Sequence, residues 1–375
     1  MASDYESPTG LLAKIPEITG PPAGSMRLQS AQASISIRRM TDEKPLGLPL
    51  RILLWVGSAI TWVVLFIGTL WAFGALWFDF PQASLRPWAA GIFGGVALLV
   101  VMLVKPRWRA KLAVALGIVL VMIWWLSLQP RQYRDWKTEV ALTPHATVEG
   151  DIVVFHQVRN FEYRTAEDFT PRYETRRLDL RKLRGVDIFV NYWGSPYMAH
   201  PIVSYDFGSD GRICFSIETR PEKGEAYSAI GGLYRQFELT YVVADERDVV
   251  RVRTNYRKGE DVYLYRLKAP YVRESFLEYV RTVNELHERP RWYNAITNNC
   301  TTAIRHQRAA SERAPWDWRM LVNGLGDQLL YERGGIDRSL PFSELKRVSL
   351  INARAKAAGD SPDFSARIRE GLPGM

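Results

Sequence analysis

The sequence is poor in cysteine, with two residues in 375, Cys214 and Cys300. Two thiols cannot build the disulfide framework of a small secreted domain, so their number leaves the redox compartment open. The sequence also lacks a phosphate-binding loop and a dinucleotide-binding fingerprint. Its five histidines and two cysteines fall at spacings that match no metal-ligand pattern. We therefore expect neither a cofactor nor a metal.

Acidic residues are fewer than basic ones, and the formal net charge is +9 with a pI near 9.5. Such a balance can indicate a nucleic-acid partner. Here, however, lysines and arginines are mixed with acidic residues through the C-terminal half, and no nucleic-acid-binding motif is found. Anionic lipid headgroups are the simpler partner for a basic membrane protein, so we expect a membrane and no nucleic acid.

Residues 1–45 lack a hydrophobic period, because prolines and glycines interrupt a run of serine, threonine and alanine. This composition predicts a disordered tail.

Between residues 46 and 130, charge is almost absent from three long apolar blocks. They run over about 50–78, 88–104 and 112–128, and none has a charged residue in its interior. Each approaches the roughly 20 residues that a helix needs to cross a bilayer, and tryptophans lie mostly toward the block ends. Three such blocks in succession predict three transmembrane helices rather than a buried soluble bundle.

Basic residues are distributed unevenly around these blocks. Four precede the first block and four join the second to the third, whereas the first connection has Arg86. The positive-inside rule then places the N-terminus in the cytoplasm and everything after residue 129 across the membrane. We expect a multi-pass protein of a cytoplasmic membrane with an exported C-terminal domain.

From residue 138 the composition becomes that of a mixed α and β domain. Strand patterns cover residues 150–155, 186–190, 199–207, 212–219, 237–243, 249–253 and 262–267. The turn Gly208-Ser209-Asp210-Gly211 joins two of them into a hairpin. Helical spacing covers residues 274–288 and 319–330, and another helix is expected from Cys300. The sequence thus predicts an α+β domain over 138–350 and a loose tail over 351–375.

The residues around Cys300 are the ones most suggestive of chemistry. Asn298 or Asn299 is expected to cap a helix that begins with Cys300, because asparagine accepts an unpaired backbone N–H of the first turn. In that turn the helix dipole favours a thiolate, and free N–H groups could bind an oxyanion. Cysteine acyl-transfer chemistry needs both. The alternative is a small apolar residue near a helix end.

A cysteine nucleophile also needs a base. His306 lies six residues beyond Cys300 on the same expected helix and so points to another part of its surface. His200, at the start of a strand, and His156, near a strand end, are nearly equal candidates from the sequence alone.

Several runs of residues resemble the family called the Lnb N-terminal periplasmic domain. They are residues 198–207, 216–220 with 222–225, 244–248 and 293–302, and the resemblance extends over roughly 150–330. The family's named member is a bacterial lipoprotein N-acyltransferase with a Cys–His pair. The resemblance implies a circularly permuted papain-like (NlpC-type) fold, with Cys300 as nucleophile and His200 as general base and acid. The order of histidine before cysteine is shared with lecithin retinol acyltransferase-like proteins. The resemblance also implies a bacterial inner membrane and a periplasmic domain.

A third residue should hold the imidazole tautomer, and Glu218 is the candidate. If the hairpin loop has three residues, His200 faces Glu218, whereas with two or four it faces Thr219. The alternative is a solvated carboxylate at a sheet edge. Cys214 is expected in the core, with a disulfide to Cys300 as the other option.

These expectations lead to a thiol acyltransferase at the outer membrane face. It would move an acyl chain from a glycerolipid or diacylglyceryl-lipoprotein to a lipoprotein N-terminal amine, or to water. A cell-wall cysteine peptidase or amidase would use the same pair of residues, and a structural cysteine would leave a tethered interaction domain. Three spans beside the nucleophile favour a lipid or lipoprotein substrate.

Overall fold

The computed structural model describes residues 47–297, 300–307, 315–320 and 322–375. The tail predicted over 1–45 lies outside these residues. The chain divides into two compact units, residues 1–63 and 64–375. The domain, the site and the contacts described below belong to the second unit.

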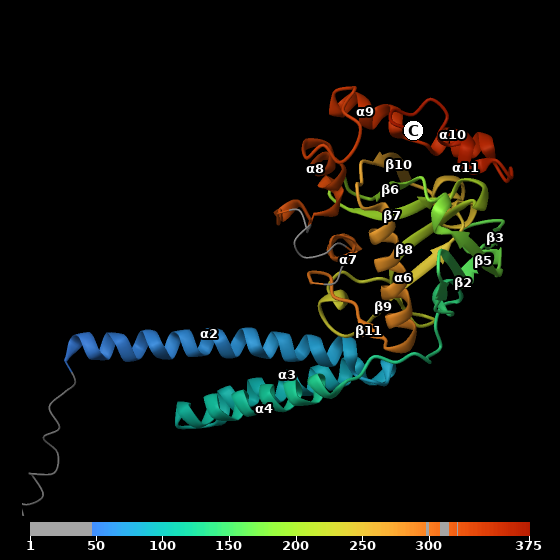
Figure 1. The fold of residues 1–375 in the computed structure, drawn as a ribbon. Helices are drawn as coiled ribbons and strands as arrows, with labels where there is room; N and C mark the ends of the chain where they lie inside the picture. Colours follow the sequence, from blue (N-terminus) through green and yellow to red (C-terminus); the bar gives the residue numbers. More distant parts are fainter. Residues whose placement is uncertain (1–46, 298–299, 308–314, 321) are drawn as a thin grey trace, which may run out of the picture. The chain divides into compact units, whose positions relative to one another are not determined.

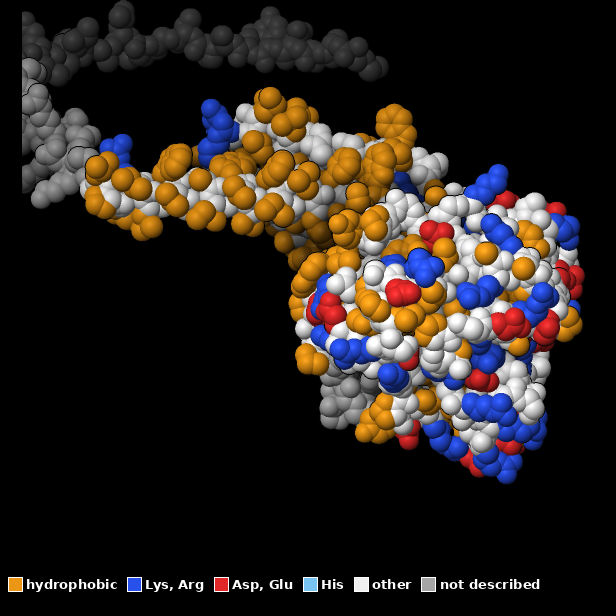
Figure 2. Space-filling view, turned by 90° about the horizontal axis from the view of Figure 1, so that it is seen from above, with side chains coloured by type: hydrophobic (Ala, Val, Ile, Leu, Met, Phe, Trp, Pro, Cys, Tyr) orange, Lys and Arg blue, Asp and Glu red, His pale blue; other side chains and the backbone are white. Residues whose placement is uncertain are grey.

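Three apolar helices form the N-terminal part of the described chain. They are α2 (Leu48–Asp79), α3 (Arg86–Leu103) and α4 (Arg107–Ser127), with a short 3-10 turn, η1 (Ala83–Leu85), before α3. All three are long and apolar enough to cross a membrane, and most of their side chains face outward. Figure 2 shows hydrophobic side chains along these helices, whereas basic and acidic side chains are interspersed over the visible face of the C-terminal domain. The three predicted membrane helices are confirmed as candidate spans.

A nine-stranded, largely antiparallel sheet forms the C-terminal domain (Figure 1). Its main path runs β1-β2-β9-β8-β7-β6-β10, with β5 beside β2 and β11 beside β9. The strands are β1 (His145–Glu149), β2 (Ile152–Arg159), β5 (Tyr173–Asp179), β6 (Gly185–Trp193), β7 (Ala199–Asp206), β8 (Arg212–Arg220), β9 (Glu238–Ala244), β10 (Glu260–Leu267) and β11 (Arg291–Trp292). A separate two-stranded pair contains β3 (Glu162–Tyr163) and β4 (Phe169–Thr170).

Helix α6 (Val272–Glu288) covers one face of the sheet. Phe276, Val280 and Val283 recur at helical spacing and are buried against strand residues such as Tyr205 and Phe215. Alternate residues of each strand point to the opposite face, where Ile202 and Cys214 pack with residues of the C-terminal helices. The described residues thus form a mixed α+β domain with cores on both faces of the sheet.

The C-terminal segment is folded, which corrects the predicted loose tail over 351–375. It follows α9 (Phe342–Ser349) and contains α10 (Asn352–Ala358) and α11 (Phe364–Arg367). Ile351, Phe364 and Ile368 are fully buried in the core on this face. The prediction was wrong because the apolar residues are sparse among alanines and glycines, and these residues stabilise helices only by packing against the sheet that they cover.

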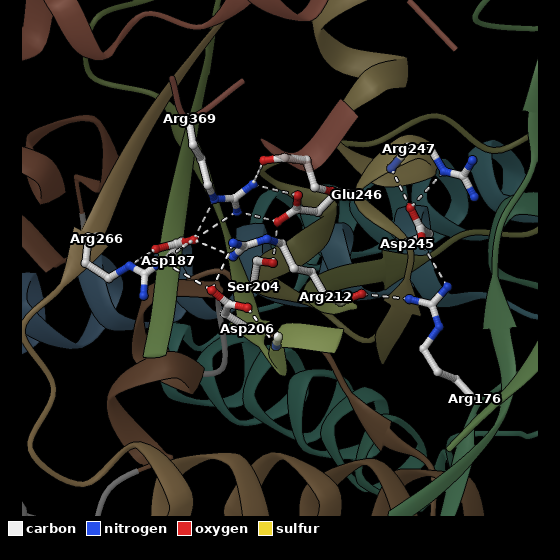
Figure 3. Close-up of polar contacts among 12 residues, drawn as sticks. Arg176, Asp187, Ser204, Asp206, Arg212, Asp245, Glu246, Arg247, Arg266 and Arg369 are labelled. Carbon is white, nitrogen blue, oxygen red and sulfur yellow. Dashed lines mark hydrogen bonds and ion pairs between the residues drawn. The ribbon is translucent and has the colours of Figure 1, made fainter. Parts of the chain in front are cut away.

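Buried ion pairs fix this segment to the strands (Figure 3). The Arg369 guanidinium donates to Asp187 of β6 at 2.9 Å and to Glu246 at 2.5 Å. Both carboxylates are fully buried, and Arg369 is 7% exposed. Arg212 of β8 also contacts Asp187, at 3.3 Å. The buried charges compensate one another, so this network holds the C-terminal segment against the sheet.

Two further element predictions require correction. Residues 249–253 were expected to form a strand, but α5 (Glu246–Val249) and the π-helical turn η6 (Val252–Tyr256) occupy this stretch. The Asp245 side chain accepts a hydrogen bond from the Arg247 N–H and so caps the start of α5. The valine-rich pattern had indicated a strand here instead. The helix predicted over 319–330 is shorter, because 3-10 turns at Trp318–Met320 and Asn323–Leu325 precede α8 (Gly326–Glu332).

Candidate active site

The hairpin of β7 and β8 brings His200 and Glu218 together. Its loop has three residues, η4 (Gly208–Asp210), closed by a hydrogen bond from the Phe207 N–H to the Gly211 carbonyl at 2.9 Å. The recorded pairing runs from Asp206 with Arg212 to Ile202 with Ser216. Two residues further along, the same register places His200 opposite Glu218, which is the arrangement expected for a three-residue loop.

Ser216, His200 and Glu218 form a hydrogen-bonded group on adjacent strands. The His200 Nε2 lies 2.7 Å from the Ser216 Oγ and 3.2 Å from the Glu218 Oε1. The Ser216 hydroxyl donates to the same carboxylate oxygen at 2.6 Å. Because that hydroxyl gives its proton to Glu218, it can accept one from His200, which favours the tautomer with hydrogen on Nε2. In this tautomer Nδ1 carries no hydrogen and is the ring nitrogen that can accept a proton.

Glu218 is held as a carboxylate by its neighbours. Burial by itself raises the pKa of this carboxyl, but the charges of His200 and Arg253 and hydrogen bonds from His200 and Ser216 bring the pKa well below its usual range. The Arg253 guanidinium donates to the Glu218 Oε1 at 2.8 Å and to the Val249 carbonyl at 2.8 Å. Arg253 is 4% exposed, so this charge is fixed within the protein.

Helix α7 (Cys300–His306) begins at Cys300 and packs against β7 and β8. For Cys300 the structure describes the backbone, and the expected capping residues Asn298 and Asn299 lie outside the described residues. Ala303 is buried in the core on the α6 face, and the side chain of Gln307 donates to the Tyr241 hydroxyl at 2.9 Å. The helix that carries the candidate nucleophile is therefore placed against the two strands that carry His200 and Glu218.

A cleft of about 280 Å³ opens beside His200. It is lined by neighbouring residues of one strand, Ile217 and Glu218, whose side chains point to opposite faces of the sheet. Tyr227 and Tyr293 border it as well. The cleft thus opens near the strand ends, and residues of both faces border it: Ile217 and Tyr293 belong to the α6 face, and His200 and Glu218 to the other.

The alternative base, His156, lies in a different place. Its ring stacks on that of His145 on the neighbouring strand, with ring centroids 4.8 Å apart, and His287 of α6 lies 4.6 Å from His145. Burial, followed by the charges of His287 and His156, lowers the pKa of His145. Of the histidines whose side chains the structure describes, His200 lines the cleft. His200 is accordingly the better placed of the two candidates.

Cys214 is a free and fully buried thiol, so it forms no disulfide with Cys300. Burial, together with the nearby Glu246 carboxylate, raises its pKa well above the usual value. Among the residues that the structure describes, no group of three or more histidine, cysteine or acidic side chains could hold a metal ion.

Two residues of the site were missed by sequence reasoning. Ser216 lies two positions before Glu218 and so on the same face of β8, a spacing that could have indicated it. Arg253 could not have been found in this way, because its segment was expected to be a strand and is the π-helical turn η6.

Residues 169–324 match the family model described as the Lnb N-terminal periplasmic domain. The match confirms the predicted resemblance and includes His200, Glu218 and Cys300, but it leaves out the three apolar helices and the C-terminal helices α9, α10 and α11. No curated protein and no solved structure matches the chain. Together, the apolar helices and the family match fit a membrane protein with a domain of a periplasmic family.

Proposed function

We propose that this protein is a thiol acyltransferase acting at the outer face of a bacterial inner membrane, with Cys300 as nucleophile and His200 as base and acid. The observation that carries the proposal is the packing of α7, which begins at Cys300, against the strands that present the His200–Ser216–Glu218 group. A permuted papain-like arrangement, as the family resemblance implies, would pair the same residues.

In the proposed reaction, the His200 Nδ1 takes the Cys300 proton and the thiolate attacks the carbonyl carbon of an acyl ester. A C–S bond forms and the tetrahedral intermediate collapses with loss of the alkoxide. The alkoxide takes the proton back from His200, leaving a thioester and an alcohol. Glu218 and Ser216 hold the imidazole and stabilise its protonated form, as the acid of a catalytic triad does.

An amine then attacks the thioester, a C–N bond forms and the C–S bond breaks. His200 removes the proton from the incoming amine, and Cys300 is regenerated. The donor in this proposal is a glycerolipid or a diacylglyceryl-lipoprotein, and the acceptor is a lipoprotein N-terminus. The three apolar helices support a lipid-linked substrate, since they keep the domain at the membrane where acyl esters are.

The proposal is tested by mass spectrometry of a model lipoprotein after incubation with the membrane-reconstituted protein. We expect N-terminal acylation by the natural chain and none by Cys300→Ala, with Cys214→Ser as the matched cysteine control that keeps its activity. Equal acylation by Cys300→Ala and the natural chain would refute the proposal. Release of muropeptides without acyl transfer would favour a cell-wall peptidase instead.

A further inference from the structure

The β8–β9 loop, residues 221–237, meets the three membrane helices where they reach one membrane surface. Helix α2 ends at Asp79 and α3 begins at Arg86, so these two ends lie on the same side. Because α3 crosses the membrane in one direction and α4 crosses back, the end of α4 at Ser127 emerges on that side too. Each of these three ends has a recorded contact with the loop.

Aromatic and ionic contacts hold the loop to α2 and α3. The ring of Tyr234 stacks on Phe78 with centroids 5.3 Å apart. Gly74, one turn earlier on α2, leaves the space that the Tyr234 hydroxyl fills, since a Cβ there would lie 2.0 Å from the hydroxyl oxygen. Glu225 forms an ion pair of 3.2 Å with Arg86 at the start of α3.

Arg235 holds the loop to the end of α4. Its guanidinium donates to the carbonyls of Trp125 at 2.7 Å and Leu128 at 2.8 Å, and it lies over the Trp125 ring. Its backbone N–H donates to Asp79 at 3.0 Å. The last carbonyls of a helix have no partner within the helix, so an arginine that binds them fixes the loop at the membrane boundary.

The same loop exposes large apolar side chains. Ile230 is 62% exposed and Leu233 is 43% exposed, on either side of a Gly231-Gly232 pair. The glycine pair itself is packed, because a Cβ on Gly231 would lie 3.3 Å from the Phe78 ring. These exposed side chains thus flank a turn that rests on the end of a membrane helix.

The loop also borders the cleft beside His200. Tyr227 lines that cleft and is 52% exposed. Gly232 accepts a hydrogen bond from the Ala295 N–H at 2.8 Å and packs against Tyr293, which is another cleft residue. The loop therefore extends from the membrane helix ends to the cleft and exposes Tyr227, Ile230 and Leu233 along the way.

We propose that Ile230 and Leu233 insert into the outer leaflet and that the β8–β9 loop is the route by which an acyl chain passes from the bilayer to the cleft. The occupant is the lipid bilayer, because the loop that exposes these two side chains contacts the ends of all three candidate spanning helices. Apolar side chains held at this level lie about 5–10 Å into the headgroup and acyl boundary. The acyl-chain part of the inference rests on the proposed acyl transfer, whereas the membrane contact stands without it.

The membrane contact is tested with an environment-sensitive fluorophore on full-length protein in vesicles of phosphatidylethanolamine and phosphatidylglycerol. The label is attached to Ile230→Cys or to Leu233→Cys, each in the Cys300→Ala background, and nitroxide-labelled lipids serve as quenchers.

The matched control is Tyr271→Cys, which is 48% exposed in the natural chain. Tyr271 precedes the 17-residue helix α6, and roughly 25 Å of helix separates it from β11, which lies beside β9 at the end of the loop. The control position is therefore far from the loop. We expect quenching at both loop positions and little at the control. Equal quenching at the loop and control positions would overturn the membrane contact.

The route is tested by activity. Ile230→Glu and Leu233→Glu should lower turnover of a membrane-embedded acyl donor about tenfold or more while turnover of a short-chain, water-soluble ester stays unchanged, because a carboxylate disfavours only the inserted state. Tyr271→Glu should change neither rate. Unchanged turnover of the embedded donor by both loop variants would overturn the route. Failure of the natural protein on both substrates would refute the proposed acyl transfer, and the quenching result would remain valid.

Discussion

The imidazole of His200 and the carboxylate of Glu218 face each other across β7 and β8, with Nε2 3.2 Å from Oε1. Ser216 bridges them, and Arg253 binds the same carboxylate oxygen from η6. This carboxylate therefore accepts hydrogen bonds from Ser216 and Arg253 beside the imidazole, which suits an anion that must stay charged while it orients a histidine.

Replacing Glu218 by glutamine should lower the turnover number by about 10²–10⁴-fold, because the amide can no longer stabilise the protonated imidazole. Acyl transfer by mass spectrometry measures the effect. Glu149→Gln, on the exposed end of β1, is the matched control and should retain full activity. Full activity in Glu218→Gln would show that this carboxylate has no part in the reaction.

Cys300 should be alkylated by iodoacetamide at about pH 6 nearly as fast as at about pH 8.5, as expected for a stabilised thiolate at a helix start. Cys214 provides an internal control, since its buried thiol should resist labelling at both values. The modified peptides are identified by mass spectrometry. A strong increase in Cys300 labelling toward the higher pH would indicate an ordinary thiol and a non-catalytic domain.

The proximity of Cys300 and His200 can be tested by cross-linking. Dibromoacetone carries two reactive carbons and should join the sulfur of Cys300 to a nitrogen of His200, giving one cross-linked peptide in the natural chain. His200→Gln should leave Cys300 singly modified. Cross-linking to another residue in place of His200 would separate the nucleophile from the proposed base.

Unfolding of the domain should depend on pH through His145, whose ring packs between those of His156 and His287. The pKa of His145 is lowered from 6.5 in the folded state, so the unfolded chain binds more protons between the two values. This contribution to stability is complete above pH 6.5 and is lost as the pH falls through the folded-state pKa. His145→Phe keeps a ring in the stack and should flatten the fall in Tm between about pH 7 and 5. An equal fall in both proteins would contradict the assignment.

Removing Arg369 should destabilise the domain strongly. Arg369→Ala leaves the buried carboxylates of Asp187 and Glu246 without their shared partner, and breaking such a buried pair costs about 3–5 kcal/mol. Arg367→Ala, at the end of α11 and two residues before Arg369, is the control, with an expected change within about 0.5 kcal/mol. Thermal unfolding of the detergent-purified protein distinguishes the two variants, and similar Tm values would contradict the role of this network.

The elements that were predicted best are those whose patterns are local. The apolar blocks and the hairpin turn at 208–211 carry their own signals, and the loop length decides which residue faces His200. The helix start at Asp245 and the folded C-terminal segment were mispredicted, because the conformation of their valines and alanines depends on packing against the sheet and not on a local pattern. Arg253 was missed for the same reason. The roles of Cys300, His200 and Glu218 stay predictions, since they concern chemistry that the fold does not by itself test.

The hydrogen bonds of Arg235 to the ends of α2 and α4 affect how the domain can move. The chain enters the domain through the segment after Ser127, and the loop fastens the domain to the same helices a second time. With one tether the domain could swing, and its cleft would often face away from the bilayer. With two attachment points the rotation of the domain is restricted, so that in the proposed acyl transfer the encounter with a lipid would depend on diffusion of the lipid within the leaflet.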